Sequence, residues 1–116
     1  MNLNGNVVKL KIIIGEDDQV YQRPLYEAIV FAAKKYKLSG ATVVKGIMNY
    51  GAGSLNQSIK VFALSHDLPV VIEMIDHRER LTDFAAIVSR LMDKAGAGGI
   101  ITMEEVEVLY YIQGES

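Results

Sequence analysis

Two segments with helical periodicity, each lying between runs of β-branched residues, constrain the fold of this chain most strongly. Residues 7–14 alternate aliphatic side chains with Lys9 and Lys11, which is typical of a strand with one buried face. Pro24 suits the first turn of a helix, because its missing N–H costs nothing there. The apolar stripe that follows recurs every three or four positions and predicts an amphipathic helix, at Leu25, Ile29, Ala32 and Tyr36.

The second half of the chain repeats this order. Residues 42–50 and 70–75 are rich in β-branched side chains and predict two further strands. Asp76 and Glu79 have the spacing of a capping box, which predicts the start of a second helix. The apolar stripe of this helix consists of Leu81, Phe84, Val88, Leu91 and Ala95.

Two segments are less clearly assigned. Residues 54–64 fit neither the helical nor the strand period cleanly, so the sequence leaves them open between helix and strand. Residues 100–103 and 106–111 predict a final strand or a pair of strands, with a break near Glu104 and Glu105.

The order of elements predicts an α+β fold, namely a ferredoxin-like βαββαβ sandwich in which two helices cover one face of an antiparallel sheet. We expect residues 1–116 to form a single domain with its core in residues 7–111. The second face of the sheet carries too many apolar residues for contact with water, among them Val8, Ile47, Val71 and Ile75. We therefore expect copies of the chain to associate through the sheet.

Composition excludes several classes of function. The formal net charge is -2, so the basic surface of a protein that binds nucleic acid is absent. The chain has no cysteine, which excludes disulfides and thiolate metal sites. No apolar run approaches the ~20 residues that span a bilayer, and the first residues do not resemble a secretion signal. We expect a cytoplasmic protein without direct membrane insertion.

Two glycine-rich segments, residues 51–54 and 96–99, are candidate ligand-binding loops. Successive backbone N–H groups in such loops can hold a phosphate or another anion, but both segments can equally be turns. The expected fold places them at the same end of the sheet. Lys45 and Lys60 flank the first segment and could balance the charge of an anion.

Catalytic and metal-binding signals are weak. His66 and His77 are the only histidines, and the expected fold places them at opposite ends of one strand, so we expect no metal site. Glu73 lies in the middle of a predicted strand, where Lys45 or Lys11 could balance its charge. No serine has a nucleophile motif, and we expect no catalytic residues.

Several spaced motifs together resemble one family of proteins. These motifs cover residues 15–18, 24–28, 40–48, 65–73 and 106–108. They are similar to an uncharacterised branch of the PII-like superfamily, known as domain-of-unknown-function family 190 (DUF190). The resemblance extends over residues 7–111.

The resemblance implies a homotrimer with a small ligand in clefts between subunits and a loop, residues 51–60, that acts on a target protein. An adenine nucleotide is one candidate ligand. Ile100 stands where the classical members have a lysine, and Tyr110 and Tyr111 stand in a strand where they have arginines. These departures disfavour the classical ATP-binding mode, so a smaller or less charged ligand is an alternative.

These observations combine into one leading hypothesis and two alternatives. The leading hypothesis is a trimeric PII-like signalling protein, without enzymatic activity, whose partner is a target protein such as a membrane transporter or channel. The alternatives are a small ferredoxin-like enzyme and a structural assembly protein without a ligand. The resemblance adds Thr42, which is similar to a threonine near the adenine in the classical members. The candidate ligand-binding residues are therefore Thr42, Lys45, Gly51, Ala52, Gly53, Ser54, Lys60, Gly96, Gly98 and Gly99.

Overall fold

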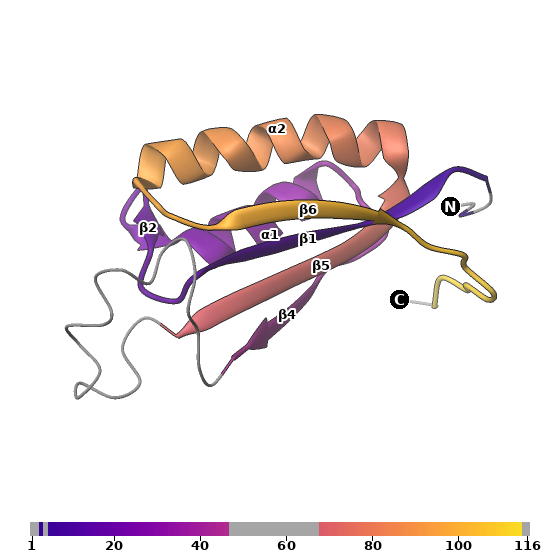
Figure 1. Cartoon of the computed structure of the whole chain (residues 1–116), viewed down its shortest axis with the longest axis horizontal. Helices are drawn as coiled ribbons and strands as arrows, with labels where there is room; N and C mark the ends of the chain where they lie inside the picture. The colour runs from indigo at the N-terminus through magenta and orange to yellow at the C-terminus, as the bar shows by residue number, and fades with distance from the viewer. Residues whose placement is uncertain (1–2, 4, 47–67, 115–116) are drawn as a thin grey trace.

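The computed structural model describes residue 3 and residues 5–46 and 68–114, and these residues form six strands and two helices. Figure 1 shows the helices stacked on one side of the strands, with both ends of the chain at the same end of the molecule. In chain order the elements are β1 (Val7–Gly15), β2 (Gln19–Val20), β3 (Arg23–Pro24), α1 (Leu25–Lys35), β4 (Thr42–Lys45), β5 (Pro69–His77), α2 (Arg78–Ala95) and β6 (Ile100–Glu105).

The main sheet has the strand order β4-β5-β1-β6, and all of its neighbouring strands are antiparallel. β1 lies at the centre, where Ile12 is paired with Ile72 of β5 and with Ile101 of β6. Both helices cover the same face of this sheet (Figure 1). The expected α+β, ferredoxin-like arrangement is therefore confirmed.

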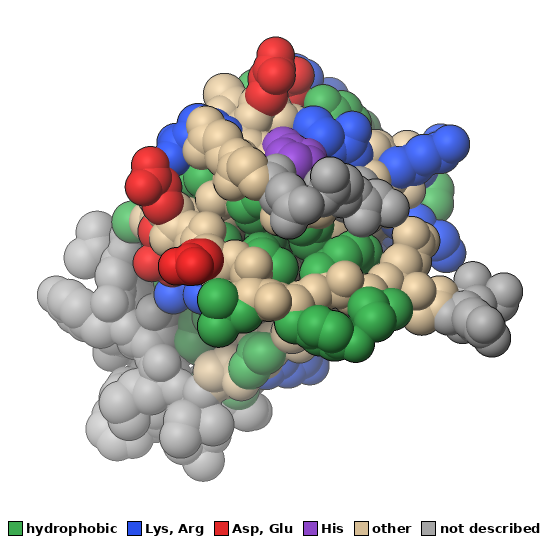
Figure 2. Space-filling model, turned by 90° about the vertical axis from the view of Figure 1, so that its right-hand side faces the viewer, with side chains coloured by type: hydrophobic (Ala, Val, Ile, Leu, Met, Phe, Trp, Pro, Cys, Tyr) green, Lys and Arg blue, Asp and Glu red, His purple; other side chains and the backbone are tan. Residues whose placement is uncertain are grey.

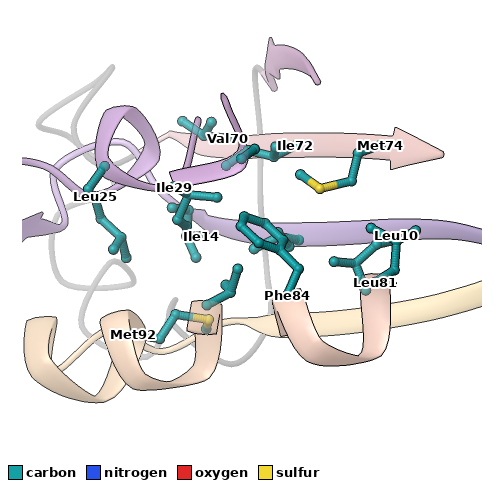
Figure 3. Packing of buried hydrophobic residues seen from close by; sticks show 14 of the residues in the cluster. Leu10, Ile14, Leu25, Ile29, Val70, Ile72, Met74, Leu81, Phe84 and Met92 are labelled. Atoms are coloured by element: carbon teal, nitrogen blue, oxygen red, sulfur yellow. The ribbon is translucent and has the colours of Figure 1, made fainter. Parts of the chain in front are cut away.

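The hydrophobic core lies between the sheet and the helices (Figure 3). Alternate residues of β1 and β5 point into it because side chains along a strand alternate between the two faces. α2 contributes the largest fully buried side chain, Phe84, whose ring centroid lies 5.8 Å from that of Tyr36. Val8 is also fully buried on the helix side, so its assignment to the second sheet face was wrong.

The start of α2 differs from the sequence-based expectation. The N-cap position is His77, and no side chain caps the helix. Asp76 still belongs to β5, and its carboxylate accepts hydrogen bonds from the backbone N–H groups of Ser39 (3.0 Å) and His77 (2.7 Å). The capping box of Asp76 and Glu79 was therefore a wrong prediction, because the carboxylate instead joins β5 to the turn that follows α1.

The last part of the chain also differs from expectation. β6 runs through Glu104 and Glu105 without the predicted break, and residues 106–111 form no strand. The predicted strand 42–50 is described only for β4 and Gly46, and residues 54–64 lie outside the described part of the chain. Gly46 packs closely against β5, since a Cβ there would lie 2.6 Å from the side chain of Pro69.

A short hairpin between β1 and α1 was not predicted. β2 and β3 pair through Val20 and Arg23, and the two residues between them, Tyr21 and Gln22, both have positive φ angles, 53° and 63°. Two positive φ angles in a two-residue loop are typical of a type I′ turn. Asn-Gly is the usual sequence signal for that turn, and Tyr-Gln carries no such signal.

Candidate functional site

The sheet face that the helices leave open is the candidate functional surface. Its centre is polar, because Lys9 and Lys11 of β1 lie beside Glu73 of β5. The Nζ atoms of these lysines are 3.6 and 3.7 Å from the Glu73 carboxylate, and Lys9 also lies 3.5 Å from Glu104. Lys11 is thus one of the two partners that were expected for Glu73, whereas Lys45 pairs elsewhere.

One end of this open face is apolar. Val44, Val71, Ile13 and Ile100 share it, because paired residues of antiparallel neighbours point to the same side. In the single chain Val44 is 56% exposed and Ile100 is 51% exposed. Side chains of this kind, contiguous across four strands, are typical of a surface that another molecule covers.

A pocket of about 530 Å³ lies at the other end of the open face. It lies where the turn before β4, the end of β5 and the C-terminal residues meet. Figure 2 views the molecule from the end at which both termini lie, and hydrophobic side chains gather in the middle of this view. The pocket is lined by Leu3, Lys9, Ser39, Gly40, Ala41, Thr42, Glu73, Met74, Ile75, Val108, Tyr110 and Tyr111.

The chemistry of this lining suits a small organic molecule with a polar edge. Tyr110 and Tyr111 offer aromatic faces on which a planar group can stack. Thr42 offers a hydroxyl group, and the Lys9–Glu73 ion pair offers both a cationic donor and an anionic acceptor. The volume is within the range of about 300–1,000 Å³ that is usual for ligand pockets.

Lys45 lies at the opposite end of β4 from Thr42, and its partner is the carboxylate of Glu16. The hydrogen bond and the negative charge of Glu16 raise the pKa of Lys45 above its usual value of 10.5. The lysine side chain is exposed, and an anion that approached it would meet a cation whose charge Glu16 already balances.

The glycine segment 96–99 has two structural roles. Gly96 has φ 65° and ends α2 in the left-handed conformation, which supports its reading as a helix cap. Gly99 packs against β1 so closely that a Cβ would collide with the carbonyl oxygen of Ile13. Gly98 and Gly99 also line an open pocket of about 470 Å³, to which Asp93 contributes a carboxylate. That negative charge disfavours a phosphate at this position within one chain.

Within one chain, the described candidate residues do not form a single site. Thr42 lies in the pocket beside the C-terminal residues, whereas Lys45 and the 96–99 segment lie at the other end of the sheet. β4 and β6 are opposite edges of the sheet, and three strand spacings of ~4.8 Å separate them by roughly 14 Å. The other candidates, Gly51, Ala52, Gly53, Ser54 and Lys60, lie outside the described residues.

The structure adds pocket residues that sequence reasoning did not select. Lys9 and Glu73 were read as strand residues, and Tyr110 and Tyr111 as members of a final strand. The alternation of lysines in residues 7–14 was the signal for a polar side of the sheet. The fold was needed to show that the C-terminal residues return to that side.

The described residues contain neither a metal-type cluster nor a membrane-spanning helix. Within residues 3, 5–46 and 68–114, no three His, Asp or Glu side chains gather as they do around a metal ion. No helix in the same part of the chain is long and apolar enough to cross a membrane. Of the two histidines, His77 lies at the start of α2, and His66 is outside the described residues.

Comparison with known proteins identifies relatives along most of the chain. Residues 7–108 match the family DUF190, described as "Uncharacterized ACR". A UPF0166 protein of Aquifex aeolicus is 37% identical over 101 residues, which cover 87% of this chain and 91% of that protein. UPF0166 protein MJ1524 of Methanocaldococcus jannaschii is 32% identical over 99 residues, which cover 85% of this chain and 88% of the relative.

One solved structure supports the fold alone. The de novo designed protein Foldit4 superposes with a TM-score of 0.51 at 12% sequence identity, over 87% of this chain and 97% of that one. At this identity the likeness concerns the arrangement of helices and strands and carries no information about a ligand.

Proposed function

The chain belongs to the DUF190 family, and from this premise we propose that it is a PII-like signalling protein that forms a homotrimer and binds a small ligand at its subunit boundaries. In this proposal the protein is cytoplasmic and acts on a target protein, such as a membrane transporter or channel, through residues 51–60. The proposal includes no catalytic step.

The single observation that carries the proposal is the pocket beside Thr42. It opens on the sheet face that the helices do not cover, and it combines two tyrosines, a hydroxyl group and an ion pair. Adenine nucleotides have a planar base that suits such aromatic walls. The pocket holds Lys9 as its cation, which favours a ligand of low charge over a triphosphate.

The apolar end of the open face supports association of subunits. Val44 and Ile100 are large exposed aliphatic residues on opposite edge strands, and Val71 lies between them. A homotrimer would remove these side chains from water, at about 25 cal/mol for each Å² of apolar surface. The same contact would bring the 96–99 segment of one subunit toward another subunit, which a ligand at a subunit boundary requires.

Ligand binding is tested by thermal unfolding with AMP, ADP, ATP and cyclic AMP as probes. A bound ligand at 100 times its dissociation constant stabilises the folded state by about 2.7 kcal/mol and raises the melting temperature. Thr42→Val removes the pocket hydroxyl and should reduce this rise. Thr102→Val is the matched control, because Thr102 lies on the same face of the sheet in β6 and does not line the pocket.

Two results would contradict the proposal. One is an unchanged melting temperature with every probe, which would favour a structural assembly protein without a ligand. The other is turnover of a bound molecule that Glu73→Gln abolishes, which would favour the alternative of a small enzyme. Light scattering that reports a monomer of 12.8 kDa at micromolar concentration would remove the trimer from the proposal.

A further inference from the structure

The residues after β6 belong to no strand of the described sheet. We call residues 106–114 the tail. Its first residue continues the β1–β6 ladder, since the N–H of Val106 donates to the carbonyl oxygen of Val7 at 3.4 Å. No later tail residue makes a backbone hydrogen bond to another described residue. Unpaired backbone groups in a segment with strand-like composition can be completed by pairing with the edge of a sheet.

The tail also has the composition of a strand. Residues 106–112 are almost entirely β-branched, aromatic or aliphatic, and none of them is proline or glycine. Three of these side chains are largely exposed: Leu109 by 87%, Tyr110 by 79% and Ile112 by 66%. A segment with strong strand propensity and exposed apolar side chains is typical of an interface that is completed by another chain.

β4 provides an edge to which such a segment can pair. It is one of the two edge strands of the described sheet, and all four of its residues are exposed. The N–H of Gly46 donates to the carbonyl oxygen of Pro69, so the pair 46–69 is a hydrogen-bonded pair of the β4–β5 ladder. Because hydrogen-bonded and non-hydrogen-bonded pairs alternate, the backbone groups of Val43 and Lys45 point away from β5.

The charges of the two edge strands, β4 and β6, differ, and this difference favours β4 as the partner of the tail. The tail carries one charged residue, Glu107, and β6 carries Glu104 and Glu105. Pairing of a tail with β6 would place like charges together, whereas β4 carries Lys45. An antiparallel pairing that sets Glu107 opposite Lys45 also sets Leu109 opposite Val43, so both outward-pointing residues of β4 would gain backbone partners.

We propose that the tail of one copy of this chain pairs as an additional antiparallel strand with the β4 edge of a second copy. The contact joins opposite edges of two sheets, and head-to-tail contacts of this kind close into rings. The register sets Tyr110 of the partner subunit opposite Thr42, so a second chain would supply the tyrosine wall that the chain's own tail supplies within one chain. The inference goes beyond the proposed function, which requires subunits to associate but does not state which segments pair.

The test compares the full chain with a chain that ends at Glu105, by light scattering over a range of concentrations. We expect the shortened chain to have an apparent dissociation constant at least tenfold higher than that of the full chain. An equal constant would overturn the tail pairing while leaving subunit association, and thus the proposed function, intact. A full chain that is monomeric at every concentration would overturn both.

Proline variants test whether backbone groups carry the contact. Leu109→Pro removes an N–H that the proposed register uses, and the side chain is so exposed that the subunit should still fold. Leu109→Ala keeps the N–H and is the matched control. On β4 the corresponding pair is Val43→Pro and Val43→Ala. We expect both prolines to raise the dissociation constant about tenfold more than their alanine controls, and equal effects of proline and alanine would overturn the strand pairing.

A charge exchange tests the register. Lys45→Glu and Glu107→Lys should each weaken association, because each places like charges opposite one another. All three variants are made with Glu16→Gln, which removes the repulsion that Glu16 would otherwise add within the subunit. The double variant should restore most of the affinity if the two residues face each other across the contact. Additive losses in the double variant would overturn the proposed register.

Discussion

The fully buried carboxylate of Asp76 lies 3.3 Å from Nε of Arg80, one helical turn further along the chain. Arg80 also donates hydrogen bonds to the backbone carbonyls of Tyr36 and Lys37, at 3.0 and 2.7 Å, and its guanidinium lies over the Tyr36 ring. The pair therefore ties the end of α1 to the junction of β5 and α2. The turn from α1 to β4 starts at this contact, and its residues Ser39, Gly40 and Ala41 line the pocket.

We expect Asp76→Ala to destabilise the protein by about 3 kcal/mol, because it removes an ion pair and leaves two backbone N–H groups without their acceptor. Urea-induced unfolding measures this change. Asp83→Ala, at an exposed position of α2, is the control and should change stability by less than ~0.5 kcal/mol. Equal effects of the two substitutions would show that Asp76 does not have the role described above.

Neighbouring residues of β5 should respond in opposite ways to the same substitution. Ile72 is fully buried against the helices, so Ile72→Asp should prevent folding. Val71 points to the open face, so Val71→Asp should leave a folded subunit that no longer associates. Circular dichroism reports folding and light scattering reports mass. A folded Val71→Asp protein with the mass of the unchanged assembly would show that this face is not the subunit contact.

Gly99→Ala should destabilise the protein by about 1–3 kcal/mol, because the added Cβ collides with the backbone of Ile13 in the central strand β1. Gly114→Ala has open space around its Cβ and should have little effect. Thermal unfolding of the two variants makes the comparison. If Gly99→Ala is as stable as the unchanged chain, β6 does not pack against β1 as closely as described.

The pKa of Lys45 should lie above 10.5, and NMR titration of its side chain measures it. A raised pKa means that the folded state holds this proton more tightly than the unfolded state does. The resulting stabilisation is fully present below pH ~10.5 and is lost as the pH rises through the pKa of the folded state. Glu16→Gln removes the negative charge and should return the pKa toward its ordinary value. A value unchanged by Glu16→Gln would exclude the ion pair as the cause.

Local sequence patterns were sufficient to predict the strands and helices that contribute most of the hydrophobic core. The alternation in residues 7–14 and the apolar stripe that begins at Leu25 predicted β1 and α1 to within a residue or two, because burial on one face imposes these periods. The stripe with Leu81, Phe84 and Val88 predicted α2 in the same way. The order of the elements then restricted the fold to the arrangement that the structure has.

Features that depend on distant partners were not predictable from local patterns. Asp76 has an acceptable spacing for a helix cap, but the backbone of Ser39 and the side chain of Arg80 compete for its carboxylate. Residues 106–111 have the composition of a strand, yet a strand also needs an edge to pair with, and composition does not provide one. The pocket beside Thr42 likewise depends on where the C-terminal residues return to the sheet.

The pairing of β1 with β5 has a consequence for how the chain reaches its fold. These two strands come from opposite halves of the sequence, and their pairs run from Val7 with His77 to Gly15 with Pro69. The centre of the sheet therefore forms only after a long loop of chain has closed, and such topologies reach the native state more slowly than helical bundles do. Loop-closure entropy grows slowly with length, at about 0.6 kcal/mol for each doubling. Evolution can therefore lengthen or shorten the connection between β4 and β5 at little thermodynamic cost.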